Sequence, residues 1–271
     1  MENPTGVVEI RGLGFSYGRR QILRGIDLDI PSGKVVAILG ISGSGKTTLL
    51  QLMGGLLKPA AGTVVVCGKN VHELDEPSLR ELRKRMGMMF QMGGLFTDMT
   101  VYENVAFPIR EHTRLPEPVI HDLVLMKLNA VGLRGAQGLK PSELSGGMSR
   151  RVALARAIAL DPDLIIYDEP FAGLDPITLN VVYNLIRTLN DALGATSVVV
   201  TYDVPEALKL ADYLYLLNDG AIVGHGPTKE MIESRDPFVH QFLHAEPDGP
   251  VRFHYPAPSI LSDLELAAGS R

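Results

Sequence analysis

The chain has 271 residues, enough for one large domain or two lobes, and 45% of them are hydrophobic, which is ample for a sizeable core. A formal net charge of −5, without a long basic run, disfavours nucleic acid as the main partner. The one cysteine, Cys67, cannot form an internal disulfide and fits a reducing cytoplasm. We expect neither a signal peptide nor a membrane span, because no apolar stretch approaches the ~20 residues that cross a bilayer. Any action on membranes would then pass through another subunit.

The elements predicted along the chain are strands at residues 7–10, 26–30, 35–39 and 63–66, a helix at 76–85, a strand at 86–90, a mainly helical stretch from about 101 to 160, a strand at 164–168, a helix at 177–193 and a strand at 197–201. Strands that alternate with helices predict an α/β fold whose central strands are parallel. The helical block at about 92–155 interrupts this alternation, which indicates an inserted lobe. After about residue 245 the tail is rich in proline, and we do not expect it to belong to the core.

The segment Gly40-Ile41-Ser42-Gly43-Ser44-Gly45-Lys46-Thr47-Thr48 fits G-x-x-x-x-G-K-[ST], the phosphate-binding P-loop. The strand at 35–39 precedes it and the apolar start of a helix follows it, which is the context that the motif needs. Its glycines let the backbone approach a polyphosphate, and successive N–H groups then point at the anion. Lys46 can reach the β- and γ-phosphates, and Thr47 can ligate Mg²⁺.

Two adjacent carboxylates, Asp168 and Glu169, end the apolar strand that begins at residue 164. Asp168 can hold Mg²⁺ through its water shell, and Glu169 can orient or polarise a water for attack on the γ-phosphate. The alternative is a pair of carboxylates that simply face solvent at a strand end. The P-loop in the same chain favours the functional interpretation.

The segment Leu144-Ser145-Gly146-Gly147-Met148 opens a helix that runs through Arg156. A serine and two glycines at a helix N-terminus predict a second anion-binding site. One nucleoside triphosphate does not obviously need two such helices from one chain, so we expect this site to serve the nucleotide of a different copy. A plain serine N-cap is the alternative.

Taken in order, these motifs resemble those of the ABC-transporter ATPase family over about residues 7–240. The P-loop matches Walker A, and Asp168-Glu169 match the Walker B aspartate and the catalytic glutamate. Residues 144–148 look like the signature LSGGQ, with methionine in place of the usual glutamine, and Gly173-Leu174-Asp175 resembles the D-loop. Gln91 matches the family glutamine that reaches Mg²⁺ and the attacking water.

The resemblance implies a P-loop NTPase fold: a central mostly parallel sheet, an N-terminal antiparallel β subdomain and a helical subdomain inserted at about 92–155. The ATPase domain would span residues 7–240, followed by a C-terminal extension at 241–271. The implied cofactors are ATP and Mg²⁺. The implied catalytic residues are Glu169, Gln91 and Tyr202, and the implied metal ligands are Thr47, Gln91 and Asp168. The residues implied in ATP binding are Tyr17, where the family stacks an aromatic ring on adenine, Gly40, Ile41, Ser42, Gly43, Ser44, Gly45, Lys46, Thr47, Thr48, Asp168, Ser145, Gly146 and Gly147.

The family resemblance further implies a head-to-tail homodimer, in which two ATPs lie between the P-loop of one copy and the signature helix of the other. Residues 90–99, 105–113, 248–251 and 253–256 look like the ATPase subunit of bacterial MCE-type lipid transporters, with the Mla phospholipid system as the best fit. In that family the ATPase pairs with an MlaE-like permease and an MlaB-like STAS protein, and an MlaD-like MCE protein belongs to the complex. The expected location is the cytoplasmic face of the bacterial inner membrane.

The chain departs from the family after the strand at 197–201. There the family places a histidine that hydrogen-bonds the γ-phosphate, whereas this chain has Tyr202. A tyrosine hydroxyl can donate one hydrogen bond, but it is neutral and lies further from its backbone. The substitution argues against fast hydrolysis but not against ATP binding.

Two functions compete with an ATPase that powers lipid transport, which is the leading hypothesis. A soluble ABC clamp on nucleic acid or ribosomes predicts a long coiled-coil insertion or two cassettes in one chain, and this acidic sequence has neither. A nucleotide-dependent switch that binds ATP, dimerises and barely hydrolyses it is kept open by Tyr202.

Overall fold

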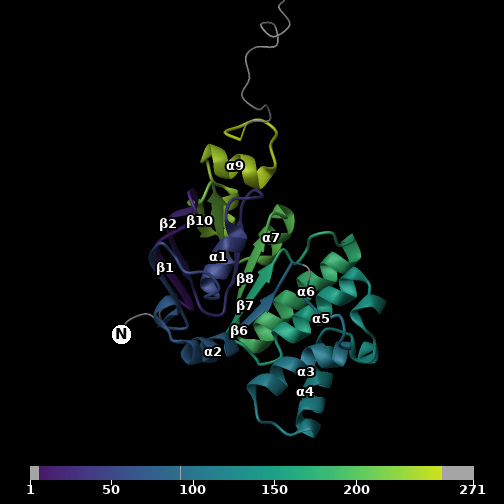
Figure 1. The fold of residues 1–271 in the computed structure, drawn as a ribbon. Coiled ribbons are helices and arrows are strands. Elements are labelled where there is room, and N and C mark those ends of the chain that lie inside the picture. The colour runs from purple at the N-terminus through teal and green to yellow at the C-terminus, as the bar shows by residue number, and fades with distance from the viewer. Residues whose placement is uncertain (1–5, 92, 252–271) are drawn as a thin grey trace, which may run out of the picture. The chain divides into compact units, whose positions relative to one another are not determined.

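The computed structural model describes residues 6–91 and 93–251; Met92 and residues 252–271, which form most of the predicted C-terminal extension, lie outside the described residues. The chain divides into two compact units, Met1–Thr228 and Lys229–Arg271. The first unit contains two β-sheets and most of the helices (Figure 1). The predicted domain limits, 7–240 and 241–271, stay a prediction.

The first sheet is antiparallel and takes its strands in the order β2-β1-β4-β5. Its strands are β1 (Val8–Tyr17), β2 (Arg20–Ile30), β4 (Ala61–Val66) and β5 (Lys69–Asn70). β1 and β2 are longer than the predicted segments. The prediction stopped short because a bulge interrupts the alternation of apolar and polar residues between the two strands. Gly12 adopts a left-handed φ of 56° at this register shift, and its N–H donates to Asp27 Oδ1 at 2.7 Å.

The second sheet takes the order β10-β9-β3-β8-β7-β6, and its neighbouring pairs are parallel except β9 with β10. Its strands are β3 (Val35–Leu39), β6 (Met86–Met89), β7 (Leu164–Asp168), β8 (Thr196–Thr201), β9 (Tyr213–Asn218) and β10 (Ala221–Pro227). The predicted α/β fold with a mostly parallel central sheet is confirmed. β3, β7 and β8 are buried along their whole length, which explains the apolar runs at residues 35–39, 164–167 and 198–200. β9 and β10 have no counterpart among the predicted elements.

The carboxyl ends of the parallel strands lie along one edge of this sheet. The register pairs Leu39 with Thr201 between β3 and β8, and it pairs Tyr167 with Met89 between β7 and β6. Ligands of open α/β sheets bind outside this edge. The topology therefore brings together the segments that follow β3, β6, β7 and β8, which are distant in the sequence.

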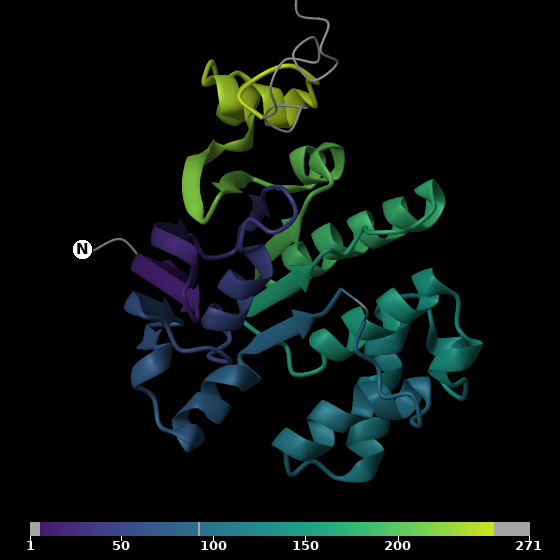
Figure 2. The same cartoon turned by 45° about the horizontal axis from the view of Figure 1, so that its top comes forward.

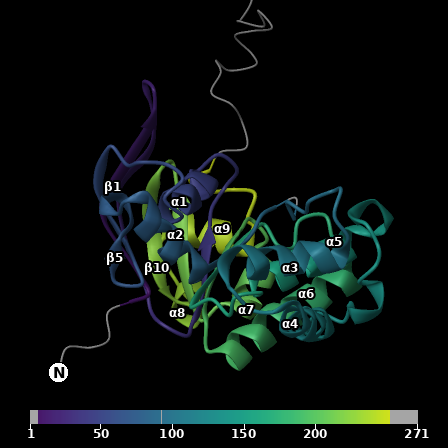
Figure 3. The same cartoon turned by 60° about the horizontal axis from the view of Figure 1, so that its bottom comes forward.

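The helices are α1 (Lys46–Met53), α2 (Glu76–Lys84), α3 (Val101–His112), α4 (Glu117–Ala130), α5 (Gly146–Ala157), α6 (Pro176–Leu193), α7 (Val204–Leu210), α8 (Thr228–Ile232) and α9 (Pro237–His244), with 3₁₀ turns at Val71–Glu73, Arg134–Ala136 and Pro141–Glu143. α3, α4 and α5 lie between β6 and β7 in the sequence. They contact one another and form a helical lobe (Figure 2). Figure 3 shows α3 to α6 gathered together, while α1 and α2 lie toward β1 and β5.

The parallel sheet lies between two hydrophobic clusters, because alternate side chains of a strand point to opposite faces. Val36 and Ile38 of β3 belong to one cluster, which includes side chains of α1 and of the antiparallel sheet. Val35 of β3 belongs to the other, with Ile165 of β7 and with side chains of α5 and α6. Burying one such side chain stabilises the fold by about 1.5–3 kcal/mol, so both faces hold the sheet in position.

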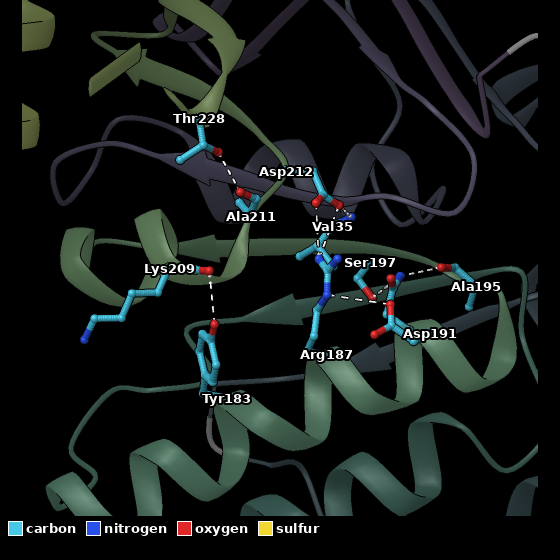
Figure 4. Close-up of polar contacts among 11 residues, drawn as sticks. Val35, Tyr183, Arg187, Asp191, Ala195, Ser197, Lys209, Ala211, Asp212 and Thr228 are labelled. Atoms are coloured by element: carbon cyan, nitrogen blue, oxygen red, sulfur yellow. Dashed lines mark hydrogen bonds and ion pairs between the residues drawn. The ribbon is translucent and has the colours of Figure 1, made fainter. Parts of the chain in front are cut away.

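A polar cluster joins three elements at the amino-terminal end of β3 (Figure 4). The Asp212 carboxylate accepts hydrogen bonds from the Val35 N–H at 2.9 Å and from the Arg187 guanidinium at 3.2 Å. Val35 begins β3, Arg187 lies on α6, and Asp212 directly precedes β9. Arg187 also lies 3.6 Å from Asp191, one turn further along α6.

We predict that Asp212→Ala lowers the free energy of unfolding by about 1–3 kcal/mol, because it leaves the N–H of Val35 without its acceptor. Asp191→Ala is the matched control, since it removes a carboxylate from the same arginine in an exposed helical pair worth only about 0.3–0.5 kcal/mol. Urea unfolding at pH 7 measures both variants. Equal shifts of the two midpoints would contradict the role assigned to Asp212.

Candidate nucleotide-binding site

A pocket of about 440 Å³ lies at the carboxyl edge of the parallel sheet and reaches the β1–β2 hairpin. The residues that line it are Tyr17, Arg20, Ile22, Ser42, Gly43, Gly45, Lys46, Thr47, Thr48, Gln91, Glu169 and Tyr202. The structure thus brings the predicted P-loop, the predicted catalytic residues and the predicted adenine-stacking tyrosine to one place.

The P-loop connects β3 to α1 through backbone that glycine adopts most easily. Gly43 and Gly45 have φ angles of 79° and 108°. A Cβ on Gly40 would lie 2.2 Å from the carbonyl oxygen of Leu217, so β9 contacts the loop directly. The loop ends at the N-terminus of α1, whose first N–H groups have no acceptor within the helix and carry its positive dipole end.

Lys46 crosses the loop from the first turn of α1 and is only 7% exposed. Its ammonium donates to Gly40 O at 2.7 Å and to Ile41 O at 3.1 Å, and it lies 3.9 Å from Glu169 Oε1. Burial lowers the pKa of Lys46, while the charges of Glu169 and Asp168 oppose that shift. The side chain therefore places a buried cation at the base of the pocket.

Asp168 ends β7 and is buried, and its Oδ1 has no hydrogen-bond partner among the described residues. Burial raises the pKa of this carboxyl, and Lys46 opposes the rise. A buried carboxylate oxygen is costly unless a cation or a donor compensates it. Thr47 and Gln91 line the pocket, and Asp168 directly precedes the lining residue Glu169; the oxygen atoms of these three side chains are of the kind that fits Mg²⁺.

Glu169 follows in a left-handed backbone conformation, with a φ of 48°, which is uncommon for a residue other than glycine. Its Oε2 accepts the N–H of Tyr202 at 3.2 Å. Burial raises the pKa of Glu169, while a hydrogen bond from Thr201 and the charge of Lys46 oppose the rise. A raised pKa makes a carboxylate a better proton acceptor at neutral pH, as a general base requires.

Two tyrosines lie at the rim of the pocket, each about half exposed: Tyr17 at 50% and Tyr202 at 49%. The Tyr17 ring is supported edge-on by Phe15, with ring centroids 4.8 Å apart. Arg20 and Ile22 also line the pocket, although neither was among the predicted site residues. Arg20 follows from the hairpin, because the register pairs it with Tyr17 across the β1–β2 turn.

The signature residues lie elsewhere: Ser145, Gly146 and Gly147 are not among the described residues that line the pocket. They open α5, where the Ser145 hydroxyl accepts the N–H of Met148 at 3.2 Å. A Cβ on Gly147 would lie 2.2 Å from Thr178 Cγ2, so the start of α5 packs tightly on the first turn of α6. The predicted residues that are likewise outside the lining set are Gly40, Ile41, Ser44 and Asp168.

Known proteins with ATP-binding functions resemble this chain over most of its length. Residues 23–172 match a family model described as ABC transporter. The chain is 54% identical over 258 residues to the intermembrane phospholipid transport system ATP-binding protein MlaF of Haemophilus influenzae, covering 95% of this chain and 98% of that protein. It is 53% identical over 263 residues to the protein of the same name from Escherichia coli K12, covering 97% and 98%.

Two solved structures share the fold. The ATP-binding cassette MJ0796, in a dimeric post-hydrolysis state bound to ADP and Pi, has a TM-score of 0.75 and 32% identity, covering 82% of this chain and 98% of that one. CbiO1 from Clostridium perfringens, part of the ABC transporter complex cbiONQ, has a TM-score of 0.79 and 29% identity, covering 88% and 95%. With the family match over more than half of its length and the near-full-length relatives, the chain belongs to the ATP-binding proteins of the ABC transporter family.

Proposed function

We propose that this chain is the ATP-hydrolysing subunit of an ABC transporter that moves phospholipids between membranes, of the Mla type. The observation that supports this most strongly is the identity of 54% and 53%, over nearly the whole chain, to proteins named for intermembrane phospholipid transport. The pocket adds the chemistry, because it combines P-loop backbone, a buried lysine and a buried carboxylate at one sheet edge.

In this proposal the P-loop N–H groups and Lys46 hold the β- and γ-phosphates, and Tyr17 stacks on the adenine. Thr47, Asp168 and Gln91 hold Mg²⁺, which neutralises charge on the phosphates when it is bound. The buried Asp168 oxygen without a partner among the described residues supports this metal position. The roles of individual residues are part of the proposal.

Glu169 is the proposed general base. Its Oε1 lies 3.9 Å from Lys46 Nζ, so the proton acceptor and the cation for the γ-phosphate face the same space. The attacking water gives its proton to Glu169 while its oxygen bonds to the γ-phosphorus, and the bond to the β,γ-bridging oxygen breaks to release ADP. Burial, which raises the pKa of Glu169, favours proton acceptance.

The position of the signature segment supports a head-to-tail homodimer. Ser145 and the glycines after it lie outside the pocket of their own chain, which leaves that helix N-terminus available to the nucleotide of a second copy. The dimeric state of the MJ0796 cassette supports a homodimer as such.

We propose an MlaE-like permease, an MlaB-like STAS protein and an MlaD-like MCE protein as partners, at the cytoplasmic face of the bacterial inner membrane. The near-full-length likeness to MlaF proteins supports this assembly. Across residues 6–91 and 93–251, no helix combines the length and the apolarity that a membrane crossing requires.

Tyr202 supports a second candidate, an ATP-dependent dimerisation switch that hydrolyses little. Its N–H bonds to the Glu169 carboxylate and its side chain lines the pocket. A phenol cannot carry the charge of an imidazolium and offers one donor on a longer side chain. The two candidates differ in turnover, not in ATP binding.

We expect the complex of this chain with its permease, reconstituted in liposomes, to transfer fluorescent phospholipid to acceptor vesicles only with MgATP. Glu169→Gln should bind MgATP normally but slow phosphate release and lipid transfer by about 10²-fold or more, because an amide cannot accept the proton. Phosphate release, lipid fluorescence and nucleotide binding are measured on the same preparations. Transfer that needs no ATP, or that Glu169→Gln leaves unchanged, would contradict the proposed function.

We predict that Lys46→Ala weakens MgATP binding by about 1.5–3 kcal/mol, because the substitution removes the cation of the P-loop and its charge-assisted contact with the phosphates. Lys58→Ala is the control, since Lys58 is exposed and is not a lining residue of the pocket. Isothermal titration measures both. Affinity of Lys46→Ala within about twofold of the unaltered protein would be incompatible with a P-loop role for Lys46.

Tyr202→His should raise ATP turnover in the assembled transporter by roughly tenfold or more. One donor to developing phosphate charge is worth about 2.7–4 kcal/mol, and the tyrosine hydroxyl recovers part of that. Tyr202→Phe, which removes only the hydroxyl, should therefore be slower than the unaltered protein. Turnover of Tyr202→His at or below the starting value would make Tyr202 a working variant and remove the support for the switch.

A further inference from the structure

Arg150, on α5, holds the backbone that follows the catalytic carboxylates. Its Nη1 donates to Glu169 O at 2.9 Å and to Pro170 O at 3.3 Å, and its Nη2 donates to Ala172 O. One guanidinium therefore satisfies three carbonyl oxygens of a single turn. Only the planar fork of arginine offers five donors in this fixed geometry.

The turn that Arg150 holds is unusual. It starts at Glu169, whose backbone is left-handed with a φ of 48°. Within the turn the Ala172 N–H reaches Glu169 O only at 3.4 Å, a long hydrogen bond. The arginine thus connects this turn to α5 through hydrogen bonds, while Phe171 of the turn is buried in the cluster that contains side chains of α5. Burial lowers the pKa of Arg150, and the charges of Tyr202 and Glu169 oppose that shift.

We propose that Arg150 is a positioning residue for ATP hydrolysis: it fixes the turn at residues 169–172, so that the Glu169 carboxylate faces Lys46. This inference rests on the proposed ATPase function. The same side chain connects the backbone of Glu169 to α5, the helix whose N-terminus is proposed to meet the nucleotide of the second copy.

α5 also contacts α6, the helix that follows the turn at residues 169–172. Gly147, in the first turn of α5, packs against Thr178 in the first turn of α6. Asp175 directly precedes α6 and caps it, because its carboxylate accepts the N–H groups of Ile177 and Thr178. α5 is thus attached at two places: through Arg150 to the turn that carries the proposed base, and through Gly147 to the first turn of α6.

Arg150→Lys keeps the positive charge but removes the planar guanidinium that donates to three carbonyl oxygens at once. We expect kcat for ATP to fall about tenfold or more, in line with the cost of misplacing a catalytic group, while KM and the dissociation constant for MgATP stay within about twofold. Arg151→Lys is the matched control, because Arg151 neighbours it on α5 but donates to Val131 O in the helical lobe. Its kcat should stay within about twofold. A purely structural role would instead lower the thermal midpoint and the amount of nucleotide bound in Arg150→Lys.

Hydrogen exchange of the peptide over residues 169–174 tests the proposal without turnover. Exchange should be faster in Arg150→Lys than in Arg151→Lys and the unaltered protein, which should match each other. If the unaltered protein hydrolyses no ATP, the proposed function fails, and the exchange result alone decides the role of Arg150. If it does hydrolyse ATP and Arg150→Lys keeps its kcat or its slow exchange, the role of Arg150 is refuted and the ATPase stands.

Discussion

The structure depends on three ionisable side chains that share a buried position at one edge of a sheet. Lys46, Asp168 and Glu169 are 7%, 6% and 7% exposed. Buried charges cost several kcal/mol unless they are paired, and here one ammonium faces two carboxylates. The cation bonds the loop that it spans, and one Asp168 oxygen has no partner among the described residues. In the proposed function, phosphate and Mg²⁺ would compensate these buried charges.

The parallel sheet makes that concentration of charge possible. β3 and β7 both neighbour β8, so the P-loop and the carboxylates leave the sheet two strands apart and meet above its edge. Apolar clusters on both faces exclude water from the strands themselves. The burial that strengthens the electrostatic interactions is therefore a product of the same packing that fixes the strand order.

The sequence allowed prediction of those parts of the candidate site whose residues are adjacent in the chain. The glycines and Lys46 of the P-loop act within one strand–loop–helix unit, and Asp168 and Glu169 follow an apolar strand directly. The full lengths of β1 and β2 could not be predicted, because the bulge at Gly12 breaks the period of two. Arg150 and Arg151 are indistinguishable in the sequence. Only the approach of α5 to the turn after β7 separates them, and that is a tertiary contact.

β3 contributes side chains to both hydrophobic clusters, Val35 to one and Val36 and Ile38 to the other. No cut through the first unit can separate the helical side from the β-rich side without dividing this strand. The two sides are thus joined through one strand of the sheet, although their elements come from different parts of the chain. Because the P-loop continues directly from β3, we expect that weaker packing in either cluster also changes the geometry of the phosphate site. Nucleotide affinity is therefore an indicator of the integrity of the whole unit and not only of the loop.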